Sequence, residues 1–474
     1  MQILLSFLPK RTLLFSIFFF ACYFLPMTLG WSEVATTPAP KPTPQLFKPT
    51  QPPTREFQLS NGLKLIVRED HRAPVAIFQI WYRVGSSYEP LGLTGISHIL
   101  EHMMFKGTNR LKPGEFSRRV AEYGGVENAS TTRDYTVYYE LWEASRMPIS
   151  FELEANRMQH AAFIAQEYNK ELNVVMEERR MRTDDDPQAK TYERFMKAAY
   201  VVSPYQQPVI GWMEDISRMN LEKVKLWYQT WYAPNNATIV IVGDVKAEAM
   251  AALAQRYFGA IPAKKLPEPP SVREIDTLGE RRLQIQLPAK LPTLFMAYNV
   301  PSLVTAKDPA EAYALRMLAG ILDSGHSARI ETQLVRKQQI AASAGVDYSL
   351  FIRGDSLLTF SGIPNNGHSL AELERAYLDQ MQQLKTTLVQ TNEMERVKAQ
   401  VVSSLIYQQD SITSQAQLLG QLESAGLSWR VLNHYLENLQ KVTPEQIQQV
   451  AQKYLTPDRL TVTSLEPITS IQPK

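Results

Sequence analysis

Cysteine is almost missing from this chain of 474 residues, which has only Cys22. A single cysteine excludes a framework of disulfides within the chain, and it excludes iron–sulfur or zinc sites built from several thiolates. Any metal ion that the protein binds must therefore be held by histidine, aspartate or glutamate, and the chain has only seven histidines.

An excess of one charge is also missing, since 50 lysines and arginines stand against 48 aspartates and glutamates, for a net charge of +2. This balance excludes a protein that binds nucleic acid through a general basic field, and we expect no nucleic-acid partner. Hydrophobic residues make up 44% and charged residues 21% of the chain, which is typical of a globular protein. At roughly 150 residues per domain, the length predicts two or three domains.

The N-terminal segment has the composition of a targeting signal. Basic residues precede an apolar run, Leu13–Leu25, and this pattern predicts a secretory signal peptide over residues 1–30. The alternatives are an uncleaved membrane anchor and, less favoured because phenylalanines precede it, a lipoprotein cysteine at Cys22. Residues 31–54 are rich in proline and predict a semi-rigid linker. We therefore expect a periplasmic or secreted protein, anchored to the membrane if the signal stays uncleaved.

The rest of the chain reads as a duplication. The segment Trp231–Gly243 resembles Tyr454–Leu465, and each contains an alternating strand that follows an amphipathic helix. Asn220 and Thr443 are the expected N-caps of these two helices. The pattern predicts two homologous domains joined by a second proline-containing linker: residues 55–261, the linker 262–278, and residues 279–470.

The order of strand and helix patterns predicts the fold class. Asn61-Gly62 between two apolar stretches is a strong signal for a β-hairpin. We expect strands over Val75–Val84, Tyr135–Leu141 and Thr293–Val300, the last followed by a helix from Asp308. Helices are expected near residues 94–106, 114–123, 145–160 and 166–183. Strands mixed with helix pairs favour an α+β protein of two homologous domains, each a mostly antiparallel sheet packed with helices.

The strongest chemical signal is the segment His98-Ile-Leu-Glu101-His102. On a helix, the two histidines lie one turn apart on the same face, so both imidazoles can bind one ion. Glu101 lies beside His102, where its carboxylate can reach a water molecule on that ion. The alternative is a pair of structural histidines, but this set of side chains would be costly to bury without a metal ion. The pattern H-x-x-E-H is the inverted zincin motif.

A catalytic zinc site needs a third protein ligand, which must come from elsewhere in the chain. Three glutamates on the helix expected near residues 166–183 are candidates. Glu171 and Glu178 are two turns apart and share a face, whereas Glu177 points about 100° away. A solvated, charged helix is the alternative for any one of them, so these residues alone leave the third ligand open.

Further segments, together with this motif, carry a resemblance to a known family over residues 55–470. The pieces are Gly85-Ser-Ser-Tyr-Glu89, Gly95 to His102, Phe105-Lys-Gly-Thr108, Gly124-Gly125, Asn128-Ala-Ser-Thr131, Asp134-Tyr-Thr136, Tyr138, Glu171 to Glu178, Tyr232-Ala-Pro-Asn235 and, more weakly, Leu322 to Arg329. The chain resembles the M16 (pitrilysin-like) zinc metallopeptidases. It is most similar to the short two-domain members, such as the subunits of mitochondrial processing peptidase and their bacterial relatives, which implies their metallohydrolase fold.

The resemblance implies a role for each residue of the expected site. His98, His102 and Glu178 would bind one Zn²⁺ per chain, and Glu101 would be the catalytic general base. Glu171 falls on the family's other helix glutamate, which supports catalysis without binding the metal. In this interpretation Glu101 accepts a proton as water attacks the peptide carbonyl, and then delivers it to the leaving amine. No zinc site is expected in the C-terminal domain.

The resemblance also implies where a substrate binds. Asn128 and Ala129 fall on an edge strand that receives extended peptide, which favours unfolded segments. Arg336 matches an arginine that holds the substrate carbonyl together with a tyrosine. Ser343 occupies the place of that tyrosine, and Tyr348 is near but out of register. We therefore expect a homologous second subunit, or a second copy of the chain, to supply the missing arginine and tyrosine pair.

Two hypotheses of different classes follow. The first is a zinc-dependent endopeptidase that hydrolyses peptides or unfolded protein segments as the catalytic subunit of a dimer. The alternative is a non-catalytic, chamber-forming or chaperone-like subunit of a similar complex. A purely structural subunit has no reason to keep the five residues of the expected site, which favours the enzyme.

Overall fold

The structure of the protein is a computed structural model that describes residues 53–468. The signal peptide predicted over residues 1–30 lies outside the described residues, as does nearly all of the linker predicted over 31–54. Strand β1 begins at Thr54, the last residue of that linker. Within the described range, no helix is both long enough and apolar enough to cross a membrane.

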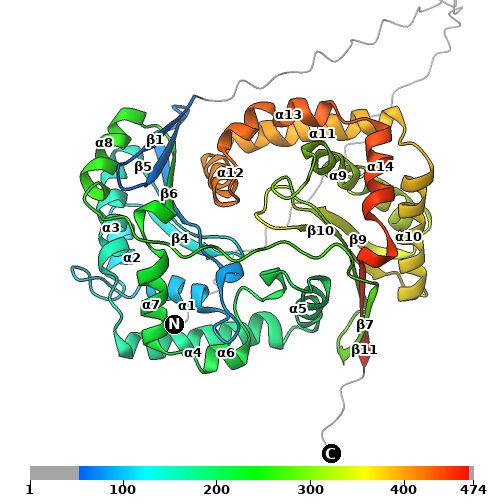
Figure 1. Ribbon diagram of the computed structural model, residues 1–474, viewed down its shortest axis with the longest axis horizontal. Coiled ribbons are helices and arrows are strands. Elements are labelled where there is room, and N and C mark those ends of the chain that lie inside the picture. Colours follow the sequence, from blue (N-terminus) through cyan, green and yellow to red (C-terminus); the bar gives the residue numbers. More distant parts are fainter. Residues whose placement is uncertain (1–52, 469–474) are drawn as a thin grey trace, which may run out of the picture. The chain divides into compact units, whose positions relative to one another are not determined.

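The first half of the described chain forms a six-stranded sheet with helices packed against it (Figure 1). The strand order is β1-β2-β6-β3-β5-β4, and every neighbouring pair is antiparallel except β2 and β6. Strands β1 and β2 form the hairpin predicted at Asn61-Gly62. The main elements of this half are β1 (Thr54–Gln58), β2 (Lys64–Glu69), β3 (Val75–Tyr82), α1 (Ile96–Met103), α2 (Glu115–Glu122), β4 (Val126–Thr131), β5 (Thr136–Glu143), α3 (Met147–His160), α4 (Ala165–Arg179), α5 (Pro187–Ala199), α6 (Met213–Ser217), α7 (Leu221–Trp231), β6 (Ala237–Gly243) and α8 (Ala247–Phe258).

The second half repeats this topology. Its sheet has the order β7-β11-β8-β10-β9, with one parallel pair, β7 and β11, in the place of β2 and β6. The predicted fold class, an α+β protein of two homologous and mostly antiparallel domains, is confirmed. The main elements are β7 (Arg281–Pro288), β8 (Thr293–Val300), α9 (Pro309–Leu322), the short helix η6 (Ile330–Lys337), β9 (Ala341–Tyr348), β10 (Ser356–Pro364), α10 (Leu370–Thr386), α11 (Thr391–Gln409), α12 (Ile412–Ser424), α13 (Leu432–Gln440), α14 (Pro444–Tyr454) and β11 (Leu460–Ile468).

Local capping signals account for where the duplicated helices begin. The side chain of Asn220 accepts a hydrogen bond from the N–H of Lys223 at the start of α7. Thr443 and Gln446 form a reciprocal capping box at the start of α14. Both caps agree with the sequence-based prediction, because each satisfies N–H groups that have no partner within the helix.

The first sheet is covered on one face by helices of its own half and on the other face by α12 from the second half. Leu419 and Leu422 of α12 pack against Ile77 and Trp81 of strand β3. At Gly420 the helix approaches so closely that a Cβ atom would lie 2.0 Å from the Trp81 ring. A larger residue at this position would therefore push α12 away from the sheet.

The second sheet shows the reciprocal arrangement, since helix α5 of the first half covers one of its faces. Phe195 and Ala199 of α5 pack with Phe295 and Ala297 of strand β8. The side chain of Asn299 donates a hydrogen bond of 2.8 Å to the carbonyl oxygen of Ala199 at the end of this helix. Helix α5 thus belongs to the first half by sequence and to the second half by packing.

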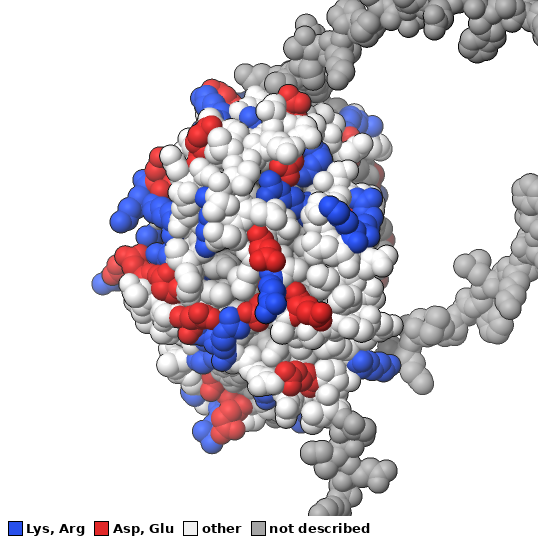
Figure 2. Space-filling model, turned by 90° about the vertical axis from the view of Figure 1, so that its right-hand side faces the viewer, with Lys and Arg blue, Asp and Glu red and all other residues white. Residues whose placement is uncertain are grey.

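Charged side chains of both signs are interspersed on the face drawn in Figure 2, without a broad area of one sign. This distribution matches the near-zero net charge of the sequence. The face drawn there has no broad basic area that would attract polyanions through a long-range field.

Candidate metal centre

Helix α1 carries the H-x-x-E-H motif and is fixed at its N-terminus. The helix starts after Gly95, whose φ of +88° suits glycine, and a Cβ atom there would lie 2.5 Å from the carbonyl oxygen of Ile210. The buried carboxylate of Glu89 accepts hydrogen bonds from the N–H groups of Gly95 (2.7 Å) and Ser97 (2.8 Å). Two of the free N–H groups of the first turn are thereby satisfied, which fixes the position of the motif.

Thr94 lies directly before the N-cap residue of helix α1 and makes contacts with a distant segment of the chain. No side chain caps α1 from the N-cap position, which Gly95 occupies. The hydroxyl of Thr94 donates instead to the carboxylate of Asp215 (2.6 Å) and accepts from the N–H of Trp212 (2.9 Å). It therefore ties α1 to the segment that leads into α6.

The side chains of His98, His102 and Glu178 converge, and one ligand atom from each lies within 4.8 Å of the others. Nε2 of His98 is 3.8 Å from one Glu178 oxygen, and Nε2 of His102 is 3.5 Å from the other. The histidines come from α1 and the glutamate from the packed helix α4. Among residues 53–468, this is the one group of histidine and acidic side chains placed to hold a metal ion.

The geometry of this cluster fits zinc. Separations of 3.5 and 3.8 Å are too long for good hydrogen bonds between these nitrogen and oxygen atoms. They are close to the separation of about 3.4 Å between two ligands that each bind a zinc ion at about 2.1 Å in tetrahedral geometry. Two imidazoles and one carboxylate leave the fourth position open, as in catalytic zinc sites.

Glu171 lies behind His102, on the side away from Glu178. One of its oxygens is 3.1 Å from Nδ1 of His102, and the other pairs with Nζ of Lys106 at 2.7 Å. Burial alone would raise the pKa of Glu171, but its contacts with His102 and Lys106 outweigh that effect and lower the pKa. An ionised carboxylate on Nδ1 holds the ring so that Nε2 faces the cluster.

The helical phase of α4 separates the three candidate glutamates. Glu171 and Glu178 face α1, whereas the side chain of Glu177 is 59% exposed and pairs with Arg180 at 2.8 Å. The structure thus brings Glu178 to the histidines and leaves Glu177 in solvent.

The pKa values of the two histidines in the cluster are shifted in opposite directions. Burial, followed by the charge of the neighbouring His102, lowers the pKa of His98 to about 4. Burial would also lower the pKa of His102, but its contacts with Glu171 and Glu178 raise it to about 9. The carboxylates therefore favour a cation at this place, either a proton on His102 or a metal ion.

Glu101 lies on the same helix, and its carboxylate is fixed by strand β4. The hydroxyl of Thr131, at the end of β4, donates a hydrogen bond to it, and the Thr131 N–H contributes a second interaction. Burial raises the pKa of Glu101 above its usual value, although these hydrogen bonds oppose the shift. A raised pKa suits a carboxylate that must accept and return a proton near neutral pH.

A cavity of about 810 Å³ opens over the cluster. Its walls come from α1, α4, β4 and α5, and they include the side chains of Arg133, Tyr192 and Met196. Because α5 packs on the second sheet, the second half of the molecule positions one wall of this cavity.

Strand β4 forms the free edge of the first sheet beside the cluster, since β5 is its one neighbour among the described strands. Asn128 and Ala129 lie on this strand and line the cavity. The N–H of Ala129 donates to the side-chain oxygen of Asn128 at 2.8 Å. Asn128 and Ala129 therefore lie on an accessible sheet edge, and their binding of a peptide stays a prediction.

Arg336, the third residue expected to bind substrate, is not brought to this cavity. It lies on η6 with its side chain 55% exposed, and its guanidinium donates to the carbonyl oxygen of His326. Ser343 is exposed on strand β9, and Tyr348 is buried with its hydroxyl donating to the carbonyl oxygen of Pro301 at 2.7 Å. Within one chain, the described residues do not assemble the expected clamp beside the metal cluster.

The matching edge strand of the second sheet, β9, is partly closed. The N–H of Val346 on this strand donates to the carboxylate of Asp323 at 2.9 Å. A side chain that occupies an edge N–H group blocks the addition of a further strand. On β4 an edge N–H group is likewise occupied, at Ala129, but by the side chain of Asn128 on the same strand, whereas the carboxylate on β9 comes from Asp323 outside the strand.

Thr131, Glu89 and Lys106 are the residues of the centre to which the sequence gave no role. Each lies within a segment that resembles the family, but nothing in the local pattern indicates its partner. Their contacts join residues from different elements, so only the folded chain reveals them.

Comparison with known proteins identifies the family. The profile described as "Insulinase (Peptidase family M16)" matches residues 64–211, which include the whole cluster. The profile described as "Peptidase M16 inactive domain" matches residues 218–401. The chain belongs to the M16 peptidase family.

Named relatives agree with this assignment. The chain is 30% identical over 415 residues to a protein named "Zinc protease PqqE" from Helicobacter pylori, covering 83% of this chain and 92% of that protein. It is similar to the crystal structure of a protease from Helicobacter pylori, with a TM-score of 0.82, 29% identity, and coverage of 88% of this chain and 100% of that one. The periplasmic protease PqqL from Escherichia coli shares the fold, with a TM-score of 0.73 and 16% identity. The matched region includes 87% of this chain and 47% of the PqqL chain.

Proposed function

We propose that the protein is a zinc-dependent endopeptidase that hydrolyses peptides or unfolded protein segments. The single observation that carries the proposal is the convergence of His98, His102 and Glu178 beside the half-buried carboxylate of Glu101. The names of its relatives, which are zinc proteases, support the same reaction class.

His98, His102 and Glu178 would hold the metal, and bound zinc would supply Lewis-acid activation of a water molecule and of the peptide carbonyl. Glu101 accepts the proton of the attacking water and delivers it to the leaving nitrogen. Thr131 keeps the Glu101 carboxylate on the cavity side, and Glu171 keeps the His102 ring in orientation. The catalytic roles of Glu101 and Glu171 are thus chemically distinct.

The free edge of β4 supports a substrate that lacks its own tertiary structure. An extended peptide that adds to this edge pairs main chain with main chain, which reads sequence only weakly. Asn128 and Ala129 would bind the peptide backbone next to the cluster.

A second subunit is part of the proposal, because Arg336 and Tyr348 lie away from the cavity within one chain. A homologous M16 subunit or a second copy would supply the arginine and tyrosine. PqqL supports this arrangement, since the present chain spans about half of that longer protein. Export to the periplasm or the exterior remains a prediction from the N-terminal residues.

The test is hydrolysis of an unstructured, fluorescence-quenched peptide library by the purified protein, alone and mixed with a homologous subunit. We expect weak activity alone, a gain on mixing, loss on chelation and recovery with one zinc equivalent per chain. A zinc-loaded protein that cleaves no peptide under any of these conditions would favour the second candidate function, a non-catalytic subunit. The observation that favours a non-catalytic subunit is the match of residues 218–401 to a family profile named for an inactive domain.

A further inference from the structure

A second cavity of about 280 Å³ lies between the two halves and adjoins the metal cavity. Both cavities are lined by Arg133, Tyr192 and Met196. The second cavity extends from these residues to strands β9 and β10 of the second half, where Asp347 lines it. Because strand β4 ends at Thr131, a peptide paired with its edge that passes Glu101 would next meet Arg133.

The backbone around Arg133 is fixed. The carbonyl oxygens of Thr132 and Arg133 accept hydrogen bonds from the N–H groups of Ser86 (3.0 Å) and Ser87 (2.9 Å). Gly85 allows this contact, since a Cβ atom there would lie 2.3 Å from the Thr132 oxygen. The Nε–H of Arg133 donates to the carbonyl oxygen of Tyr205 at 3.0 Å. This bond anchors the guanidinium at Nε, and among residues 53–468 its two terminal nitrogens have no hydrogen-bond partner.

Arg133 differs from the other cations of the metal cavity in having no acidic partner. Lys106 pairs with Glu171 and Arg182 pairs with Glu178, each at 2.7 Å. Over residues 53–468, no carboxylate oxygen lies within the 4.0 Å of an ion pair with Arg133. A half-buried guanidinium that keeps free N–H groups is a binding group for a carboxylate, which it can hold with two parallel hydrogen bonds.

We propose that Arg133 selects substrates by binding a carboxylate of the peptide, at the junction of the two cavities. The proposal rests on the proposed peptidase function and adds to it the charge of the preferred substrate. The carboxylate can come from an acidic side chain close to the cleaved bond or from the C-terminus of the peptide. Tyr192 and Met196 form a partly apolar wall of the same two cavities, and an ion pair is stronger beside apolar groups than in open water.

Asp347 limits how much negative charge the second cavity accepts. It lies on the wall formed by β9, is exposed, and has no ion-pair partner among the described residues. A second acidic residue that reached this wall would be repelled, so one acidic group is preferred over an acidic run. The two walls together favour a peptide with a carboxylate at Arg133 and a neutral or basic residue toward Asp347.

The experiment compares pairs of unstructured peptides that differ by glutamate against glutamine at each position around the cleaved bond. At one position, we expect kcat/KM to be at least about 10-fold higher for the glutamate peptide than for the glutamine peptide. Mass spectrometry of the products locates the cleaved bond and so identifies this position. The Arg133→Gln variant should lose this preference, and Arg133→Lys should keep part of it. A second set of peptides with free and amidated C-termini shows whether a terminal carboxylate is the group recognised.

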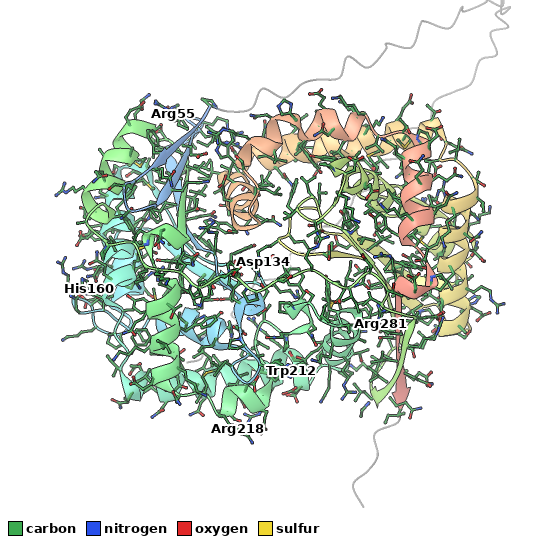
Figure 3. All side chains as sticks on the ribbon, viewed as in Figure 1. Arg55, Asp134, His160, Trp212, Arg218 and Arg281 are labelled. Atoms are coloured by element: carbon green, nitrogen blue, oxygen red, sulfur yellow. The ribbon has the colours of Figure 1, made fainter. Side chains whose placement is uncertain are left out.

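Arg218→Gln is the matched control, because this arginine is 76% exposed and pairs only with Glu214 of its own helical segment among the described residues. Figure 3 shows it at the outside of the molecule, away from the labelled Asp134 that follows Arg133 in sequence. The control should keep the full preference, and thermal unfolding checks that each variant is folded. If the wild type cleaves peptides without an acidic preference, or Arg133→Gln leaves the preference unchanged, the role of Arg133 is overturned. If the zinc-loaded wild type cleaves nothing, the proposed function fails instead.

Discussion

The hydroxyl of Thr131 donates a hydrogen bond to the carboxylate of Glu101, which links the free edge of the first sheet to the helix that carries the metal cluster. The strand that would receive a peptide and the base that would act on it are thus fixed relative to each other. This contact holds the Glu101 carboxylate next to the end of strand β4.

Replacing Thr131 by valine keeps the shape of the side chain and removes the hydroxyl. We expect kcat to fall by about 10-fold or more, because a charge-assisted hydrogen bond of this kind contributes about 1.5–3 kcal/mol. Zinc content should not change. Thr131→Ser retains the hydroxyl and serves as the control, and an equal loss of kcat in both variants would contradict this role.

Separate alanine substitutions of Glu178 and Glu177 test which of the two glutamates is the third metal ligand. Glu178→Ala should weaken zinc binding by more than the 10–100-fold that loss of an outer partner costs. Glu177→Ala should leave affinity unchanged, since this side chain is exposed and pairs with Arg180. Competition with a chelator of known affinity gives both values, and loss of zinc from the Glu177 variant alone would place the wrong glutamate at the cluster.

Glu89 predicts a pH dependence of stability. Burial, aided by the charge of Asp215, raises the pKa of Glu89 to about 7 in the folded protein despite its two backbone hydrogen bonds. Between about pH 4.5 and 7 the folded state then binds more protons than the unfolded state, so this residue's contribution to stability falls as pH rises. The change is on the order of 3 kcal/mol across that window.

Glu89→Gln stays neutral and should lack this pH-dependent part. Urea unfolding of the wild type and the variant across the same pH range measures the difference between their free energies of unfolding. If the free energies of unfolding of the two proteins change with pH in parallel, the pKa of Glu89 is not raised.

Tyr348→Phe should affect stability and not catalysis. The variant leaves the carbonyl oxygen of Pro301 without its hydrogen bond, at a cost of about 1 kcal/mol. Because the ring is buried in the core of the second half, we expect kcat per zinc-loaded chain to stay at the wild-type value. A fall in kcat with unchanged stability would mean that Tyr348 reaches the substrate after all.

Local patterns were sufficient to predict much of the fold. The hairpin at Asn61-Gly62, the capped helices after Asn220 and Thr443, and the strand Thr293–Val300 all form as expected. Each depends on residues close together in the sequence, so that propensity and capping decide the outcome. The same is true of His98 and His102, whose spacing alone places them on one face of a helix.

Contacts between distant segments could not be predicted in this way. The covering of the first sheet by α12 depends on a close approach between Gly420 and Trp81, which no periodicity reveals. The hydrogen bond from Thr131 to Glu101 and the distance of Arg336 from the cavity are likewise set by tertiary packing. The third ligand lay between these extremes, because helical phase placed Glu171 and Glu178 on one face and Glu177 on another but did not decide which residue binds the metal.

The account depends most on a metal centre in which Glu101 moves the proton and does not hold the metal. The most direct measurement is the zinc content and peptide turnover of Glu101→Gln beside the wild type, in the same preparation and with the same partner subunit. We expect about one zinc per chain in both proteins and turnover at least ~10²-fold lower in the variant. Retained turnover in Glu101→Gln, or a wild type that binds no zinc, would contradict the account.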